Sequence, residues 1–343
     1  METIWFFLVA AMIAVYVILD GFDLGAGIVH LLVARTDSDR RAVLASIGPV
    51  WDGNEVWLLA GGGTLYFAFP ALYASGFSGF YLPLMIVLWL LILRGISIEF
   101  RNHVRSLVWQ PLWDAVFAGS SALLALFFGA ALGNVVRGVP LDRAGEFFLP
   151  LWTDFMPDRG AAGILDWYTV LVAVAALAAL TVHGALWIAL KTEGQLERRA
   201  RRLAGAVWWL LLLLVMAITL ASFRLQPHLK ESFAARPWGY LFPLSALAGL
   251  VGIRILKGGE AFLGSCLFLF GMLTSVAFGL YPDVLPSNAD PALSLSIYNA
   301  AAPRYGLTVG LYWFIPGILL AIGYFIYTYS HSSGKVTAGE SGH

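Results

Sequence analysis

The chain has 343 residues, of which 59% are hydrophobic and 12% are charged, and its formal net charge is zero. A soluble domain is typically about half apolar and about a quarter charged, so this chain has more apolar surface than one soluble core can bury. The balanced charge gives no sign of a nucleic acid partner or of an acidic substrate. The composition therefore predicts a protein that resides in a membrane.

Nine segments are long and apolar enough to cross a bilayer core, which takes about 20 residues per helix. They are expected at residues 3–33, 50–70, 77–100, 114–136, 163–190, 204–223, 238–256, 260–281 and 305–329. The start METIWFF lacks a basic region and a cleavage pattern, so the first segment should remain as a spanning helix. The sequence thus predicts an all-α, polytopic integral membrane protein with one transmembrane domain over residues 1–329. A polar tail at 330–343 is expected to be disordered in the cytoplasm.

Basic residues orient the predicted helices through the positive-inside rule. With the N-terminus outside, 14 of the 21 lysines and arginines lie in inner segments and 7 lie in outer ones. The bias predicts an N-out, C-in arrangement.

Four carboxyl residues lie in the first two predicted helices, as pairs spaced three apart. Asp20 and Asp23 lie in ILDGFDLGAGIVH, and Asp52 and Glu55 lie in GPVWDGNEVWLL. Each pair shares a helix face, and the rise per residue places both pairs in the cytoplasmic half of the membrane. Charge in a spanning helix is costly and points to function. A proton relay is one interpretation of these acids.

Structural interpretations of the same acids stay open. Asp52 falls in the first helical turn, where the helix dipole favours a carboxylate, so it can be an interfacial cap. Asp20 and Asp23 lie deeper and can pair with Arg94 or bond to a neighbouring helix.

The histidines give little support for a haem in this chain. Haem iron is usually held by His, Met, Cys or Tyr, and only His30 and His183 lie within predicted helices, each towards an inner end. The sequence has no CxxCH motif and no cluster of residues with metal-ligand spacing. We therefore expect no metal and no haem bound by this chain.

Residues 20–105 carry a set of motifs in a fixed order. They read DGFDLGAG, then WDGNEVWL, then AFP, then SGFY, and ALWIALKTEG follows up to Gly194. Together these stretches closely resemble subunit II of the bd-type quinol oxidases. Beyond Gly194 the likeness rests on helix number and length.

The resemblance implies an assembly that oxidises ubiquinol or menaquinol and reduces oxygen to water in a bacterial cytoplasmic membrane. Subunit I would carry haem b and haem d, and this chain would be its haem-free partner, with its helices in two four-helix bundles plus one peripheral helix. The family also allows for a small single-helix subunit. Proton uptake from the cytoplasm is assigned in the family to a hydrophilic path, whose motif positions here are Asp20, Asp23, Asp52, Asn54 and, less securely, Glu55.

Three residues outside the acid pairs also have a predicted role. Trp57 resembles a tryptophan on a proposed oxygen path, although ordinary helix packing explains it equally well. Arg94 and Arg101 are expected to anchor an inner helix end at the headgroups by snorkelling and local pairing, and a contact with a bound quinone or an anionic lipid is the alternative. Two alternative functions stay open: a proton-coupled secondary transporter, for which the sequence shows no inverted repeat, and a purely structural scaffold subunit.

Overall fold

The computed structural model describes residues 1–156, 162–332 and 334–336, and in these the chain is almost entirely helical. The longer helices are α1 (Glu2–Val33), α3 (Trp51–Ala68), α5 (Tyr81–Phe100), α6 (Trp109–Arg137), α7 (Trp167–Lys191), α8 (Gly194–Leu225), α10 (Leu241–Ile255), α11 (Gly259–Leu280) and α12 (Arg304–His331). Shorter helices are α2 (Asp37–Ile47), α4 (Pro70–Gly79), α9 (His228–Ala235), η2 (Pro237–Tyr240) and η3 (Pro291–Leu293). Strands β1 (Asp283–Leu285) and β2 (Leu295–Ser296) form a small antiparallel pair.

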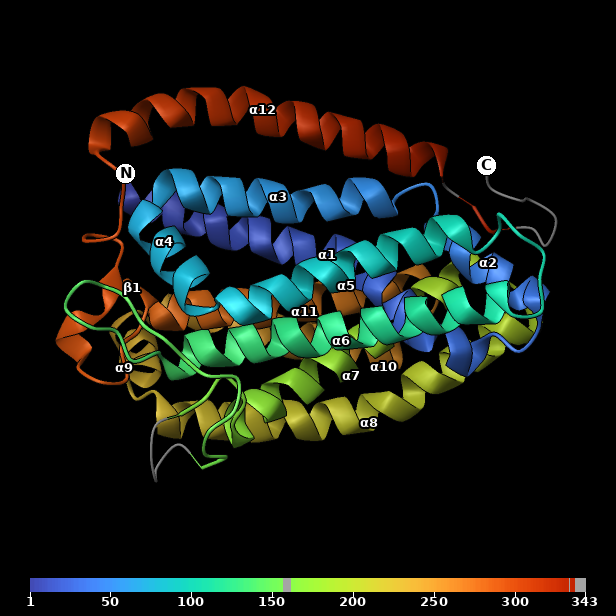
Figure 1. The fold of residues 1–343 in the computed structure, drawn as a ribbon, viewed down its shortest axis with the longest axis horizontal. Coiled ribbons are helices and arrows are strands. Elements are labelled where there is room, and N and C mark those ends of the chain that lie inside the picture. The colour runs from blue at the N-terminus through green and yellow to red at the C-terminus, as the bar shows by residue number, and fades with distance from the viewer. Residues whose placement is uncertain (157–161, 333, 337–343) are drawn as a thin grey trace.

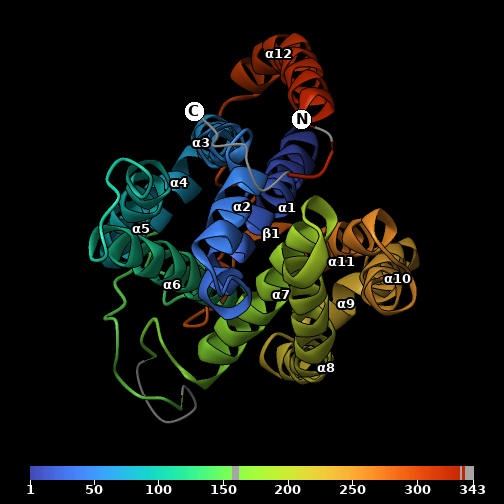
Figure 2. The same ribbon diagram turned by 90° about the vertical axis from the view of Figure 1, so that its right-hand side faces the viewer.

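The long helices fall into two groups of four with one helix outside them (Figure 2). α1, α3, α5 and α6 pack together, α7, α8, α10 and α11 form the other group, and α1 also contacts α7 and α11. α12 lies beyond α3 and α1, and the start of α1 and the end of α12 lie at opposite ends of the bundle (Figure 1). The expected arrangement of two four-helix groups and one peripheral helix is confirmed, whereas the N-out, C-in orientation stays a prediction.

Eight of the described helices are long and apolar enough to cross a membrane. They correspond to all the expected spans except the second, which is α3. α3 carries Asp52, Asn54 and Glu55 in its first two turns, and these polar residues make it less apolar than its neighbours. Its 18 residues still extend about 27 Å at 1.5 Å per residue, close to the thickness of a bilayer core.

Several predicted boundaries differ from the structure. The span expected at 77–100 is broken, since α4 ends at Gly79 and α5 begins at Tyr81. α8 begins at Gly194, ten residues before the expected start at 204, because its basic, amphipathic first turns continue the helix beyond the apolar run. α12 runs to His331 and Val336 N–H donates to the Lys191 carbonyl at 2.8 Å, so the tail expected from 330 is helical and docked in its first part. Residues 337–343 of that tail lie outside the described residues.

The backbones of α1 and α7 approach each other closely at the centre of the bundle. A Cβ atom added to Gly25 would lie 2.6 Å from the backbone nitrogen of Gly184, and one added to Gly184 would lie 2.1 Å from the carbonyl carbon of Gly25. Only glycine lets two helix backbones approach this closely. The contact holds the inner half of α1 against α7 and leaves its other faces to α3, α5 and α6.

α12 packs loosely against the rest of the chain. Leu307 is its only buried residue among those described, and Tyr329 is half-buried near its end. Between α1, α3 and α12 lies an apolar cavity of roughly 600 Å³, lined in part by Trp5, Trp57 and Phe314.

Candidate functional site

Polar side chains from four helices meet around the middle of α1. We call this set the α1 acid cluster, and it consists of Asp20 and Asp23 from α1, Asn54 and Glu55 from α3, Arg94 from α5 and Tyr329 from α12. Asp20, Asp23, Asn54 and Arg94 are fully buried. The cluster therefore joins residues that are up to 309 positions apart in the sequence, from Asp20 to Tyr329.

Arg94 links two carboxyl groups of the cluster. Its Nη1 donates to Asp20 Oδ2 at 2.8 Å and its Nη2 donates to Asp20 Oδ1 at 2.6 Å, a bidentate pair. Nη2 also lies 3.1 Å from Glu55 Oε2. The Glu55 side chain is 25% exposed, so this acid connects the buried pair to the outer surface of the helix bundle. Bidentate geometry makes the Asp20–Arg94 contact strong and specific.

Asp23 has a different set of partners. Asn54 Nδ2 donates to Asp23 Oδ2 at 2.7 Å, and Tyr329 Oη donates to Asn54 Oδ1 at 2.8 Å. The second carboxyl oxygen of Asp23 is buried and has no hydrogen-bond partner among the described residues. Asp23 is thus held by the Asn54 amide, which Tyr329 holds in turn, and no cation is in direct contact with it.

The other expected site residues take separate places. Asp52 lies in the first turn of α3 and is exposed, and it is not bonded to the α1 acid cluster in the described structure. It shares a helix face with Glu55 three residues on. Trp57 is 8% exposed and lines the apolar cavity, with its ring 5.5 Å from that of Phe325.

Arg94 and Arg101 both lie inside the bundle and form the local pairs that were expected with their anchoring at the headgroups. Both side chains are buried, at 0% and 1% exposure, and each is taken up by carboxylates of its own chain. Pairing within the bundle replaces snorkelling, because a guanidinium with carboxylate partners no longer needs water or headgroups for its hydrogen bonds. Neither residue is available as a lipid or quinone contact in this chain.

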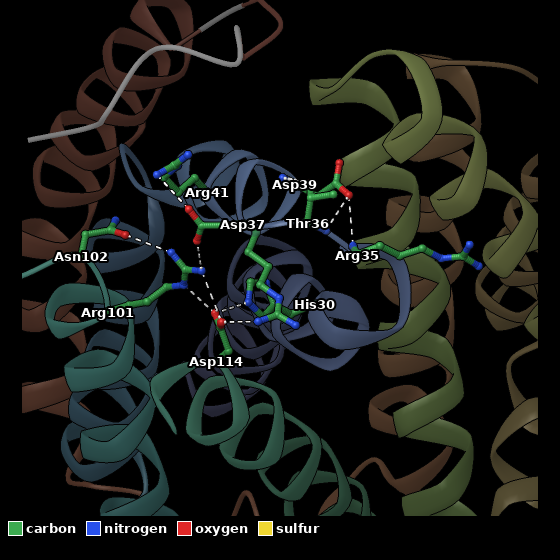
Figure 3. A network of polar contacts seen from close by, with 10 residues as sticks. His30, Arg35, Thr36, Asp37, Asp39, Arg41, Arg101, Asn102 and Asp114 are labelled. Atoms are coloured by element: carbon green, nitrogen blue, oxygen red, sulfur yellow. Dashed lines mark hydrogen bonds and ion pairs between the residues drawn. The ribbon is translucent and has the colours of Figure 1, made fainter. Parts of the chain in front are cut away.

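A second network surrounds Asp114 near the predicted cytoplasmic ends of the helices (Figure 3). We call it the Asp114 cluster, and it contains His30, Asp37, Arg40, Arg101 and Asp114. Asp114 Oδ1 accepts from Arg101 Nε at 2.6 Å and lies 2.7 Å from His30 Nε2. Its Oδ2 accepts from Arg40 Nη1 at 2.9 Å. This carboxylate therefore ties α1, α2, α6 and the end of α5 together.

The loop and helix next to this cluster are fixed by a capping box. Thr36 accepts from the Asp39 backbone N–H, and Asp39 Oδ2 accepts from the backbone N–H of Thr36 at 3.1 Å, which satisfies the first turn of α2. Burial alone would raise the pKa of Asp39, but these N–H donors and the positive charge of Arg199 hold that pKa below its ordinary value. Arg199 Nη2 lies 2.7 Å from Asp39 Oδ2, so α8 is anchored to the same loop.

Tyr329 and Asp114 were not predicted from the sequence, nor was the contact of His30 with Asp114. One signal was present: His30 follows Asp23 by seven residues, which places the two side chains on one helix face. Asp114 was visible only as the first residue of an expected span. Nothing in a single sequence pairs Tyr329 with Asn54, because their contact depends on how α12 lies against α3.

The histidine contacts bear on haem ligation. His183 is fully buried, with Nδ1 at 2.7 Å from Ser265 Oγ and Nε2 at 2.9 Å from the carbonyl of Ile18. Both ring nitrogens are occupied, and His30 Nε2 is engaged by Asp114. Among the described residues, no three His, Cys, Asp or Glu side chains are arranged to hold a metal ion.

Comparison with known proteins gives matches over nearly the whole chain. The family model described as "Cytochrome bd terminal oxidase subunit II" matches residues 1–331. The "Probable cytochrome oxidase subunit 2" of Haemophilus influenzae is 31% identical, over 98% of this chain and 95% of that protein. The "Cytochrome bd ubiquinol oxidase subunit 2" of Bacillus subtilis is 30% identical, over 90% and 89%. The "Cytochrome bd-I ubiquinol oxidase subunit 2" of Escherichia coli K12 is 26% identical, over 97% and 94%.

A solved structure supports the fold. The bd oxidase from Geobacillus thermodenitrificans contains a chain that superposes with a TM-score of 0.73 at 17% identity, covering 95% of this chain and 96% of the other. Likeness at that identity concerns the fold alone. The family model, by contrast, spans the DGFD and WDGN motifs and every helix that contributes to the α1 acid cluster. On these matches, the chain belongs to the cytochrome bd terminal oxidase subunit II family.

Proposed function

We propose that this chain is the haem-free subunit II of a quinol-oxidising terminal oxidase in a bacterial cytoplasmic membrane. Its partner would be a subunit I that holds haem b and haem d, the groups that carry electrons from quinol to oxygen. The names of the Bacillus subtilis and Escherichia coli relatives, as subunits of ubiquinol oxidases, support this. The occupied nitrogens of His183 support haem ligation outside this chain. Family membership leaves the transporter alternative without support.

Within that assembly, the α1 acid cluster is proposed to hold protons and pass them to the oxygen-reducing centre. The observation that carries the proposal is a charge imbalance: the cluster holds the three carboxyls of Asp20, Asp23 and Glu55 but only one guanidinium. Arg94 contacts Asp20 and Glu55, whereas Asp23 is bonded to the Asn54 amide. Burying several unpaired carboxylates is far more costly than binding protons to them. A buried acid without a cation in contact can take up and release a proton, and Asp23 meets that condition.

The cluster also has a route to the surface of the chain. Glu55 is partly exposed, and Asp52 lies one turn earlier on the same face of α3 and is exposed. A proton that arrives at Asp52 would reach Glu55 and then the groups around Asp20. Acid chains of this kind are what proton relays in membranes use.

The scaffold alternative has one observation in its favour. Asp20 and Arg94 form a complete, fully buried bidentate pair, which is typical of a structural lock between helices. We therefore assign Asp20 to holding α5 against α1 and Asp23 to proton exchange. The two residues should behave differently when each is neutralised.

The apolar cavity beside Trp57 supports the expectation of an oxygen path. Its lining contains few polar groups, and an apolar gas is more soluble in such surroundings than in water. Trp57 forms part of its wall. We propose that oxygen can pass along this side of α1 and α3 towards the partner subunit.

The test compares Asp23→Asn, Asp20→Asn and Asp52→Asn in the assembled oxidase. Asp23→Asn should lower quinol-driven oxygen consumption per haem by roughly tenfold, less than the hundredfold or more that loss of an obligatory proton-transferring group costs, while haem content stays normal. Asp20→Asn should reduce the amount of assembled complex more than the rate per complex. Asp142→Asn, on an exposed loop, is the matched control, because asparagine keeps the acceptor oxygen that binds the N–H groups of Ala144 and Glu146. Full turnover of all three variants at normal assembly would favour a scaffold.

A further inference from the structure

Four of the buried polar atoms without hydrogen-bond partners in the described structure lie on the C-terminal half of α1 or on the parts of α2 and α6 next to it. They are Arg40 Nε, His30 Nδ1, Ser121 Oγ and Asp23 Oδ1. Buried polar atoms are nearly always bonded, and those without a protein partner commonly bind ordered water. Since the four atoms lie close to one face of α1, bound water in this region would supply hydrogen-bond partners to all of them.

Helix geometry places these atoms in one line. At 100° per residue, Asp23, Gly27 and His30 fall within about 60° of one another on α1. A Cβ atom on Gly27 would lie 2.1 Å from Ser121 Oγ, so this hydroxyl of α6 rests against α1 at Gly27. Gly27 is about 6 Å along the axis from Asp23 and about 4.5 Å from His30. Successive polar groups along this face are therefore one to two helical turns apart or less, and water can connect polar groups that do not touch directly.

The line continues from His30 to the surface through Arg40. Arg40 Nη1 and His30 Nε2 both contact the carboxylate of Asp114. The Arg40 side chain is 28% exposed, while its Nε is buried. One end of the line therefore meets solvent, and the other end is Asp23 in the α1 acid cluster.

The contacts of Asp114 determine which nitrogen of His30 is free to accept a proton. Asp114 accepts hydrogen bonds from the guanidinium groups of Arg40 and Arg101, so it is a carboxylate. It must accept from His30 as well, which places a hydrogen on Nε2 and leaves Nδ1 with a bare lone pair. His30 Nδ1 is thus a base, buried and without a partner, whose conjugate acid would be balanced by Asp114.

From this geometry we infer that the contact between α1 and α6 contains a water-mediated proton route from Arg40 through His30 and Ser121 to Asp23. In this route His30 Nδ1 takes a proton from a water on the Arg40 side and returns it to a water on the Ser121 side. Ser121 Oγ and the Arg40 N–H orient the waters, and Asp23 Oδ1 receives the proton. One proton enters and one leaves, and no other bond changes. The route rests on the proposed role of Asp23 and would add an uptake branch to the one through Asp52.

The groups that face His30 are consistent with this role. Asp114 on α6 lies in hydrogen-bond contact with the ring, and Arg40 on α2 and Arg101 after α5 each share that carboxylate with it. The ring of Phe117 packs against the imidazole with centroids 5.4 Å apart. The positive charges of Arg40 and Arg101 disfavour the protonated form of His30, while the negative charge of Asp114 favours it. A group that relays protons must be able to form its protonated state and then lose the proton.

Ser121→Ala in the assembled oxidase tests the route, and Ser120→Ala is its matched control. Ser120 is the adjacent buried serine of α6, but its hydroxyl already donates to the Val116 carbonyl of its own helix at 2.7 Å. Ser121→Ala should slow quinol-driven oxygen reduction about threefold, less than the hundredfold or more that loss of an obligatory proton-transfer group can cost, and it should raise the solvent deuterium isotope effect. Ser120→Ala should change neither. Equal behaviour of the two variants would overturn the route.

Two further variants separate this inference from the proposed function. His30→Gln keeps a donor towards Asp114 but cannot carry a proton, so it should match Ser121→Ala in rate and isotope effect. In the double variant Asp23→Asn with Ser121→Ala, the rate should equal that of Asp23→Asn alone, because groups in series are not additive. If Asp23→Asn is slow while Ser121→Ala and His30→Gln run at full rate, the route is wrong and the role of Asp23 stands. If Ser121→Ala is slow while Asp23→Asn is not, both are wrong.

Discussion

The two buried polar clusters of this chain differ in their balance of charge. The α1 acid cluster contains three carboxyl groups and one guanidinium, and Asp23 is held only by an amide. In the Asp114 cluster, one central carboxylate binds two guanidinium groups and a histidine, and Asp37 completes the pairing of Arg101. The first has acid in excess, whereas the second has acids matched by cations.

This difference separates two uses of buried charge. A matched cluster has little to gain from a change in protonation, so Asp114, Arg40 and Arg101 hold the helices in position. A cluster with excess acid changes its electrostatic energy with each proton it binds. Proton exchange is therefore expected at Asp23. The Asp114 cluster holds His30 in position, two turns further along the same face of α1.

The largest effect should follow removal of the one cation in the α1 acid cluster. Arg94→Met leaves the buried Asp20 carboxylate without its partner, and breaking a buried pair in this way typically costs about 3–5 kcal/mol. Assembled complex should fall strongly, as measured by haem content of purified membranes and by thermal unfolding. Adding Asp20→Asn to Arg94→Met should restore part of the assembly, since the uncompensated charge is removed. No restoration would mean that the pair does not act through its charge.

A smaller loss is expected from Asp114→Asn in the matched cluster. The amide keeps one acceptor oxygen but loses the charge that binds Arg40 and Arg101, and loss of a charged hydrogen-bond partner costs about 1.5–3 kcal/mol. Arg40 is partly exposed, so water can replace its lost hydrogen bond to Asp114, which reduces the loss of stability. Thermal unfolding of the complex should show a decrease smaller than that of Arg94→Met. The reverse order would contradict the comparison of the two clusters.

The smallest effect should come from the surface edge of the same cluster. Arg41 pairs with Asp37 at 2.9 Å, but the two side chains are 49% and 46% exposed. Exposed pairs of this kind contribute roughly 0–1 kcal/mol, so Arg41→Ala should leave thermal unfolding and turnover nearly unchanged. A large destabilisation would show that Asp37 depends on Arg41 to stay bonded to Arg101.

Much of the fold follows from the sequence because lipid imposes simple rules. Apolar runs of bilayer length predicted the long helices, among them α10 and α11 at the expected spans 238–256 and 260–281. The missed features are those that apolar runs do not encode. α2 is polar and is fixed by the Thr36–Asp39 capping box, and α8 extends into water through basic turns.

Most residues of the candidate site were predicted from the sequence, but only some of the contacts between them were. The motifs identified Asp20, Asp23 and Asn54, and Arg94 was one of the partners considered for the aspartates. The division of labour between Asp20 and Asp23 was not predictable, because it depends on which helix each side chain faces. Arg94 lies on α5 and faces Asp20, while Asn54 lies on α3 and faces Asp23.

Infrared difference spectroscopy of the assembled oxidase tests the role of Asp23 most directly. Reduction and reoxidation should produce a carboxyl C=O band that disappears in Asp23→Asn, persists in Asp142→Asn, and shifts when the protein is equilibrated in deuterium oxide. That result would identify Asp23 as a group that changes its protonation during turnover. Identical carboxyl bands in the unsubstituted oxidase and in Asp23→Asn would contradict the account, since the acid in excess would then keep its proton throughout the cycle.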